Sequence, residues 1–326
     1  MHAGRNSRLN RHASWLALSV AAFVIVAGPQ TASAAGAGSA NADPWDLCTS
    51  SKPEEGIAGC TQILQSGSES ERNRAIAHRN RGLAYKDIGE YDLAIEDYQA
   101  SVALDPTYVA SYNDMGIAYR AKGDVDRAIA AYSEALRLDP TYAYGYNNRG
   151  NAYRDRGDLD LSIADYDRAI QLDPQYVYAY NGRGNAHQDK GELELAVADY
   201  TAAIKYDPNY AAAYNGRGNA YRDLGEIDLA IADYDQSIML DPAYVFPYNG
   251  RGNAYKDKGE IDLAIADYNK ALELNPDYAF AYNGRANAWA AKGEAEKAIA
   301  DYTESIKRDP GYAVAYRNRG LSYEDI

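Results

Sequence analysis

An unbroken period of 34 residues runs through most of this 326-residue chain. When each repeat is counted from position 1 to position 34, starting at Ala75, position 8 is Gly in every repeat except one, where it is Ala286. Position 20 is Ala or Ser, and position 32 is Pro in all seven complete repeats. A fixed period of this length predicts a linear array of similar units, each of which packs mainly on its neighbours.

Each repeat has two segments with the spacing of an amphipathic helix. Apolar or aromatic residues fall at positions 4, 8 and 11, and again at positions 17, 20, 21, 24, 27 and 28. Gly at position 15, followed by Asp or Glu, is expected to end the first helix and start the second. The Asp-Pro pair at positions 31 and 32 ends the second helix, since a residue before proline avoids helical geometry. Each repeat is therefore predicted to be a helix-turn-helix.

These residues resemble the tetratricopeptide repeat (TPR). The repeat length, the small residues at positions 8 and 20, the aromatics at positions 4, 11 and 24 and the terminal Pro all agree with that family. The resemblance covers Ala75 to Ile326, and it implies an all-α, right-handed superhelical solenoid whose concave face is formed by the first helices. The chain departs from the family at position 4, where Tyr or His replaces Trp, and at position 7, where Arg replaces Leu.

The same period divides the chain into segments. Residues 1–34 are predicted to be a signal peptide, because three arginines precede an apolar run from Trp15 to Ala27 and the small residues Ala32 to Ala34. The apolar run is too short for a comfortable membrane span. Residues 35–74 are expected to be a linker and a degenerate N-terminal capping repeat, and residues 313–326 a partial eighth repeat or a capping helix. The seven complete repeats are 75–108, 109–142, 143–176, 177–210, 211–244, 245–278 and 279–312.

Two cysteines, Cys48 and Cys60, lie in the predicted capping repeat. If the chain is exported, they meet an oxidising compartment, and the sequence then predicts a disulfide between them. Two reduced and buried thiols are the alternative. Ser51 and Glu54 are expected to cap the helix that follows, and residues 67–73 to form a polar linker.

Position 7 carries an Arg in every repeat except the second, which has Met115. Position 23 carries an Asp in every complete repeat except the second, which has Ala131. We therefore expect each Arg to form an ion pair with the Asp of the second helix, whereas an Arg that reaches a ligand is the alternative. The partial eighth repeat gives Arg319 no such Asp. The expected pairs are Arg81 with Asp97, Arg149 with Asp165, Arg183 with Asp199, Arg217 with Asp233, Arg251 with Asp267, and Arg285 with Asp301.

Two rows of asparagines are the candidate binding site. Positions 2, 5, 9 and 12 face away from the partner helix, on the side that is the concave groove in TPR proteins. An amide both donates and accepts hydrogen bonds, which suits recognition of an extended peptide backbone. A solvated filler copied with the repeat is the alternative explanation. The groove residues are Asn147, Asn151, Asn181, Asn185, Asn215, Asn219, Asn249, Asn253, Asn283 and Asn287, with Tyr144 and Tyr178 at position 2.

These features predict an exported, non-catalytic interaction scaffold that binds an extended protein segment and holds no cofactor or metal. A glycan-binding or polysaccharide-export accessory scaffold is the alternative, because amides and aromatic rings also suit sugars. The net charge of −14 argues against nucleic acid and anionic membrane surfaces as partners. No stable membrane insertion is expected, and the periplasm is favoured over the external medium. The oligomeric state stays open.

Overall fold

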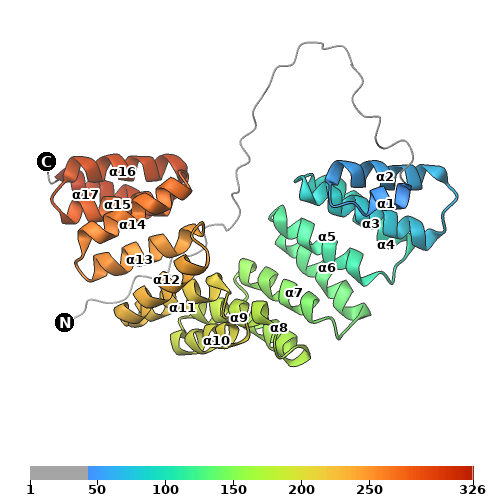
Figure 1. Ribbon diagram of the computed structural model, residues 1–326, viewed down its shortest axis with the longest axis horizontal. Coiled ribbons are helices and arrows are strands. Elements are labelled where there is room, and N and C mark those ends of the chain that lie inside the picture. The colour runs from blue at the N-terminus through green and yellow to red at the C-terminus, as the bar shows by residue number, and fades with distance from the viewer. Residues whose placement is uncertain (1–42, 325) are drawn as a thin grey trace, which may run out of the picture. The chain divides into compact units, whose positions relative to one another are not determined.

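The computed structural model of this chain describes residues 43–324 and 326. These residues form α-helices joined by short turns, and the helices follow one another in antiparallel pairs (Figure 1). The all-α fold predicted from the sequence is confirmed over the described residues. The predicted signal peptide lies outside them. The helices are α1 (Pro44–Cys48), α2 (Pro53–Ser66), α3 (Glu71–Asp87), α4 (Tyr91–Leu104), α5 (Val109–Ala121), α6 (Val125–Leu138), α7 (Ala143–Arg156), α8 (Leu159–Leu172), α9 (Val177–Lys190), α10 (Leu193–Tyr206), α11 (Ala211–Leu224), α12 (Ile227–Leu240), α13 (Val245–Asp257), α14 (Ile261–Leu274), α15 (Ala279–Ala291), α16 (Ala295–Arg308) and α17 (Ala313–Glu324).

The chain divides into two compact parts. The N-terminal block ends at Leu172 and holds α1 to α8, and the C-terminal block, Asp173–Ile326, holds α9 to α17. Within each block, every first helix packs against the second helix of its own repeat and against the next first helix. Each block is thus a stack of repeats.

The turns follow from residues that recur in every repeat. After α11, Gly225 has a φ of 85°, and its N–H donates to the carbonyl of Arg222 while the next N–H donates to the carbonyl of Tyr221. This is a Schellman motif, which needs the left-handed conformation that glycine adopts without strain. After α10, Asp207 accepts a hydrogen bond from the backbone N–H of Asn209 at 2.9 Å. That bond closes the turn around the intervening proline.

The N-terminal cap differs from the sequence prediction in two details. Helix α3 begins at Glu71, where Ser70 accepts from the Asn73 N–H at 3.1 Å, so the polar linker is shorter than residues 67–73. The predicted cap by Ser51 and Glu54 is wrong, because α2 begins at Pro53 after Lys52, which makes no side-chain cap bond. The Ser50 hydroxyl instead donates to Glu55 at 2.8 Å, which holds the entry to the helix.

The disulfide between Cys48 and Cys60 is confirmed, with an S–S distance of 2.04 Å. It joins the end of α1 to the middle of α2, and both cysteines are buried against Ile63 and Ala77. The bridge therefore holds α1 and α2 together over the first helix of the first complete repeat.

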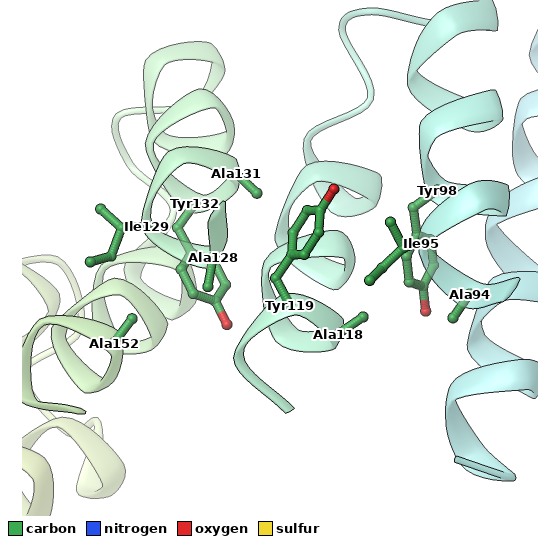
Figure 2. Packing of buried hydrophobic residues seen from close by; sticks show 10 residues of the cluster. All are labelled: Ala94, Ile95, Tyr98, Ala118, Tyr119, Ala128, Ile129, Ala131, Tyr132 and Ala152. Atoms are coloured by element: carbon green, nitrogen blue, oxygen red, sulfur yellow. The ribbon is translucent and has the colours of Figure 1, made fainter. Parts of the chain in front are cut away.

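The tyrosine at position 24 is the centre of each repeat. From Tyr98 to Tyr268 it is at most 1% exposed in all six repeats. In the N-terminal block, the rings of Tyr98 and Tyr132 lie among small and β-branched residues of α4 to α7 (Figure 2). A Cβ placed on Gly218 would lie 2.9 Å from the Tyr234 ring, and a Cβ on Gly250 would lie 2.5 Å from it. The ring of Tyr234 is thus clamped between the first helix of its own repeat and that of the next.

All six expected Arg and Asp residues face each other at hydrogen-bonding distance. Arg217 donates from Nε and Nη2 to the two carboxylate oxygens of Asp233, both at 2.8 Å, and the other five pairs have the same bidentate geometry. The Asp side chains are at most 11% exposed, whereas the Arg side chains are about one-fifth exposed. Such a planar two-bond pair is the strong form of ion pair.

The same Arg also contacts the repeat before it, which the sequence did not lead us to expect. Arg217 Nη1 donates to Thr201 at 3.1 Å, Arg251 Nη1 donates to Asp235 at 2.5 Å, and Arg285 Nη1 donates to Asn269 at 2.6 Å. Arg319, which has no Asp of its own, keeps this contact through Thr303 at 3.1 Å. Arg217, Arg251 and Arg285 therefore each link adjacent second helices.

We predict that the pair between Arg217 and Asp233 shows strong coupling. Asp233→Ala should lower the free energy of unfolding by about 3 kcal/mol, because it leaves a largely buried guanidinium without its partner. Arg217→Met with Asp233→Ala should cost less than the two single variants combined, since the second repeat already carries Met115 and Ala131 at these positions. Urea unfolding of the four proteins measures the cycle. Additive losses would mean that the pair contributes nothing of its own.

Candidate functional site

The ten predicted asparagines lie on five first helices. Asn147 and Asn151 are on α7 in the N-terminal block, and the other eight are on α9, α11, α13 and α15 in the C-terminal block. The C-terminal set forms two rows, at positions 5 and 9 of four neighbouring first helices. We call these eight residues the amide face: Asn181, Asn185, Asn215, Asn219, Asn249, Asn253, Asn283 and Asn287.

Each asparagine at position 9 is held by a buried tyrosine. The hydroxyl of Tyr234 donates to Asn219 Oδ1 at 2.8 Å, and Tyr268 donates to Asn253 Oδ1 at 2.7 Å. The same bond joins Tyr166 to Asn151, Tyr200 to Asn185 and Tyr302 to Asn287, at 2.6 to 2.8 Å. Burial raises the pKa of the Tyr234 hydroxyl well above its ordinary value, so this hydroxyl stays protonated and remains a donor.

Each asparagine at position 5 turns its oxygen inward. The Oδ1 atoms of Asn147, Asn181, Asn215, Asn249 and Asn283 are all buried, and none of them has a hydrogen-bond partner. A carbonyl oxygen in this position is closed to a ligand. Position 5 is also more buried than the sequence analysis assumed, since Asn147, Asn215 and Asn283 are only 6–7% exposed.

Both rows therefore present the same half of the amide. The oxygens at position 9 are occupied by tyrosine hydroxyls and those at position 5 are buried, so the NH₂ groups are the atoms left for a ligand. An NH₂ group only donates hydrogen bonds. The amide face is thus a regular array of donors, which suits a partner with regularly placed acceptors.

Aromatic rings border the amide face. Tyr178 on α9 is 59% exposed, as expected for position 2, and Tyr144, at the same position of α7 in the N-terminal block, is 45% exposed. Asn283 Nδ2 donates to the hydroxyl of Tyr312 at 3.4 Å, which places the tyrosine at position 34 beside the asparagine row. Burial raises the pKa of Tyr210 and Tyr244, which share position 34, to about 12. These hydroxyls stay neutral at physiological pH.

Charged side chains at positions 12 and 13 are paired with each other. Arg222 lies 3.5 Å from Asp223 and 3.9 Å from Asp257, and Lys256 lies 3.7 Å from Asp257. Gln188 occupies position 12 one repeat earlier and donates to Asp223 at 3.2 Å. These pairs leave the edge of the amide face close to neutral, so a partner needs no net charge of its own.

The N-terminal block has a different arrangement at the same positions. Arg79 donates to Asp114 at 2.7 Å, Asn148 donates to Asn113 at 2.9 Å, and Asn113 Nδ2 lies 3.4 Å from Asp114 Oδ1. Burial raises the pKa of Asp114 above its ordinary value despite Arg79. These side chains bond to one another across α3, α5 and α7, so the two rows of asparagines on neighbouring first helices are a feature of the C-terminal block.

Sequence reasoning missed the residues that orient the amides. The tyrosine at position 24 was recognised only as a core residue, and no packing role was predicted for the glycine at position 6, as in Gly250, which lies against the Tyr234 ring. A signal was present in the sequence. Position 9 is Leu83 and Ile117 in the first two repeats, but it is Asn in the five repeats that follow.

Sequence profiles confirm the repeat. One described as "TPR repeat" matches residues 116–153, 150–191, 188–221 and 218–259. Two described as "Tetratricopeptide repeat" match residues 75–108 and 246–278, and residues 97–130. These matches run without a gap from residue 75 to residue 278, which is more than half of the chain. The chain belongs to the tetratricopeptide repeat family. No curated protein sequence matches this TPR chain.

Solved structures of TPR solenoids have the same fold. A chain of the APC/C hetero-tetramer Cut9-Hcn1 has a TM-score of 0.66 at 18% identity, over 86% of this chain and 54% of that one. A tetratricopeptide repeat protein from Parabacteroides merdae has a TM-score of 0.65 at 20% identity, over 76% and 98%. Yeast Tom70 has a TM-score of 0.59 at 19% identity, over 84% and 59%. This TPR chain spans about half the length of the Cut9-Hcn1 chain, and identities this low establish the fold alone.

In the part of this TPR chain that the structure describes, none of the helices has both the length and the apolar character that a membrane span needs.

We predict that the bond between tyrosine and asparagine stabilises the repeats that have it. Tyr234→Phe should lower the free energy of unfolding by about 1 kcal/mol, because the Asn219 oxygen loses its donor. Tyr98→Phe is the matched control. Its hydroxyl is buried without a partner, so its removal should be neutral or slightly stabilising. Thermal and urea unfolding of both variants measure the difference, and equal losses would show that the bond contributes nothing.

Proposed function

We propose that this TPR array is an interaction scaffold that binds an extended segment of another protein along the amide face of the C-terminal block. The observation that carries the proposal is the shared orientation of the amides. Their oxygens are bonded or buried, and their NH₂ groups remain for a ligand. Peptide carbonyl oxygens are acceptors at fixed intervals along an extended chain, so they match an array of donors.

The spacing of the repeats fits an extended segment. Neighbouring helices pack roughly 8–10 Å apart. An extended chain rises about 3.3 Å per residue, so about three residues would pass each repeat. Recognition through backbone carbonyls places little demand on the partner's side chains.

The proposal includes export to the periplasm. The order of basic, apolar and small residues over 1–34 supports it, and so does the disulfide of Cys48 and Cys60, because such bonds persist in oxidising compartments. The partner would then be another envelope or secreted protein.

A glycan is the second candidate partner. The exposed ring of Tyr178 favours it, because a sugar ring can stack on an aromatic face and sugar hydroxyls accept hydrogen bonds from amides. Both candidates use the same NH₂ groups. The nature of the bound material separates them.

We predict that Asn219→Asp with Asn253→Asp abolishes binding and leaves the fold intact. Each Asp keeps an acceptor for Tyr234 or Tyr268, but it removes the NH₂ donors and adds a negative charge that repels carbonyl oxygens. Both proteins carry a photo-crosslinking amino acid in place of Tyr178 and are irradiated in the cells that make them. The crosslink yield of the double variant should be at least about fivefold lower than that of the protein with both asparagines. Circular dichroism and urea unfolding should change little.

The matched control is Asn209→Asp with Asn269→Asp. It adds the same charge at two exposed asparagines outside the amide face, and Asp235 already fills the position of Asn269 one repeat earlier. This control should crosslink like the wild type. Adducts whose protease digest contains crosslinked peptides of a second protein support a protein partner, whereas adducts whose digest contains this chain's own peptides joined to sugar support the glycan. Equal yields from both double variants would contradict the proposal.

A further inference from the structure

A ladder of aromatic rings lies beside the amide face. Positions 34 and 2 alternate along the ladder, and neighbouring ring centroids are 5.0–6.0 Å apart. The first part of the ladder is Tyr176, Tyr178 and Tyr210, and the second part is Tyr244, Phe246, Tyr278, Phe280 and Tyr312.

The ladder is interrupted at one place, Ala212. This residue occupies position 2 of its repeat, where the repeat before it has Tyr178 and the two repeats after it have Phe246 and Phe280. At each of those, the position 2 ring contacts the tyrosine at position 34 on both sides. Ala212 offers Tyr210 and Tyr244 only a methyl group in place of that ring.

The geometry of the neighbouring repeat shows what fits at this place. Phe246 lies between Tyr244 and Tyr278 with interplanar angles of 72° and 88°, so it makes an edge contact with each. Aromatic rings prefer this arrangement, which contributes about 0.5–1.5 kcal/mol per pair beyond the burial of area. A flat ring between Tyr210 and Tyr244 would gain two such contacts.

We propose that Ala212 is the specificity-determining residue of the binding face, and that it receives one aromatic side chain of the bound protein segment. The inference rests on the proposed function and names the side chain that the segment supplies. The inserted ring completes the ladder between Tyr210 and Tyr244, while the backbone of the same segment accepts hydrogen bonds from the adjacent NH₂ groups of Asn215 and Asn219.

Two observations favour an aromatic side chain over other occupants. The charges of Arg222, Lys256, Asp223 and Asp257 are paired on the same face, so nothing there selects a charged side chain. A ring can stand edge-on between two such tyrosines, as Phe246 does between Tyr244 and Tyr278, and a puckered sugar is thicker than such a ring. Ala212 is half-buried, so the site is open to a ligand.

The test uses a phage library of random 12-residue peptides, selected on the full chain. Fluorescein-labelled synthetic copies of the selected peptides are then measured by fluorescence anisotropy. The peptides should carry a Phe, Tyr or Trp whose change to Ala weakens binding at least about tenfold. Ala212→Phe should weaken binding of the parent peptide by a similar factor. It should weaken binding of the Ala-substituted peptide little further, because that peptide no longer has a ring to insert.

Two measurements serve as controls, one for folding and one for the place of the added ring. Ala212→Phe should fold with an unchanged or raised Tm, because Phe already occupies this position in the next two repeats. Val314→Phe adds a ring at position 2 of α17, where Val314 is 41% exposed, and it should bind the peptide like the wild type. Both proteins are compared at the same ionic strength.

The outcomes separate this inference from the proposed function. If Ala212→Phe binds as the wild type does while Asn219→Asp with Asn253→Asp loses binding, the receiving site is wrong and the scaffold stands. If the selected peptides also bind Asn219→Asp with Asn253→Asp as tightly as the wild type, or if the library yields no binding peptide, both the inference and the proposed function are wrong. Binding of a soluble glycan instead of peptides, lost in Ala212→Phe, would also overturn the assignment of a protein side chain.

Discussion

The ring of the tyrosine at position 24 is the contact on which each repeat depends. It is buried against the first helix of its own repeat, and at Tyr200, Tyr234 and Tyr268 the first helix of the next repeat closes over it. At Tyr234, a Cβ on Gly218 or Gly250 would collide with the ring, so these two positions hold glycine. A glycine inside a helix costs about 1 kcal/mol relative to alanine, and the buried ring offsets that cost.

The same tyrosine connects packing to recognition. Its ring sets how closely the repeats approach, and its hydroxyl fixes which end of the asparagine at position 9 faces outward. In the first two repeats, Leu83 and Ile117 replace that asparagine, and the hydroxyl of Tyr98 is left without a partner. The ion pair of Arg217 and Asp233 works beside this contact by tying the two helices of the repeat to each other and to Thr201. The orientation of the NH₂ groups on the surface therefore depends on buried tyrosines of the core.

The sequence was sufficient for features that recur with the period. The helix pairs and the glycine turns follow from residue types at fixed positions, and the spacing of Arg217 and Asp233 indicated their contact. The disulfide does not recur with the period, and it was predicted from the two cysteines and the expected export. The orientation of the amides was not predictable in this way. It depends on a hydrogen bond between Asn219 and Tyr234, two side chains on different helices, and on the inward turn of Asn215. The packing of Gly250 on Tyr234 joins two repeats, so a count within one repeat could not reveal it.

The clamp on the tyrosine ring is tested most directly by the sign of one stability change. Gly250→Ala should destabilise the protein by about 1–3 kcal/mol, because the new Cβ would lie 2.5 Å from the Tyr234 ring. In a Tyr234→Leu background, the same change should become neutral or stabilising by up to about 1 kcal/mol, as expected for alanine in a helix. Urea unfolding of the four proteins gives both values. If Gly250→Ala stabilises the wild type by the full helix-propensity gain, the ring does not set the approach of the repeats, and the account is contradicted.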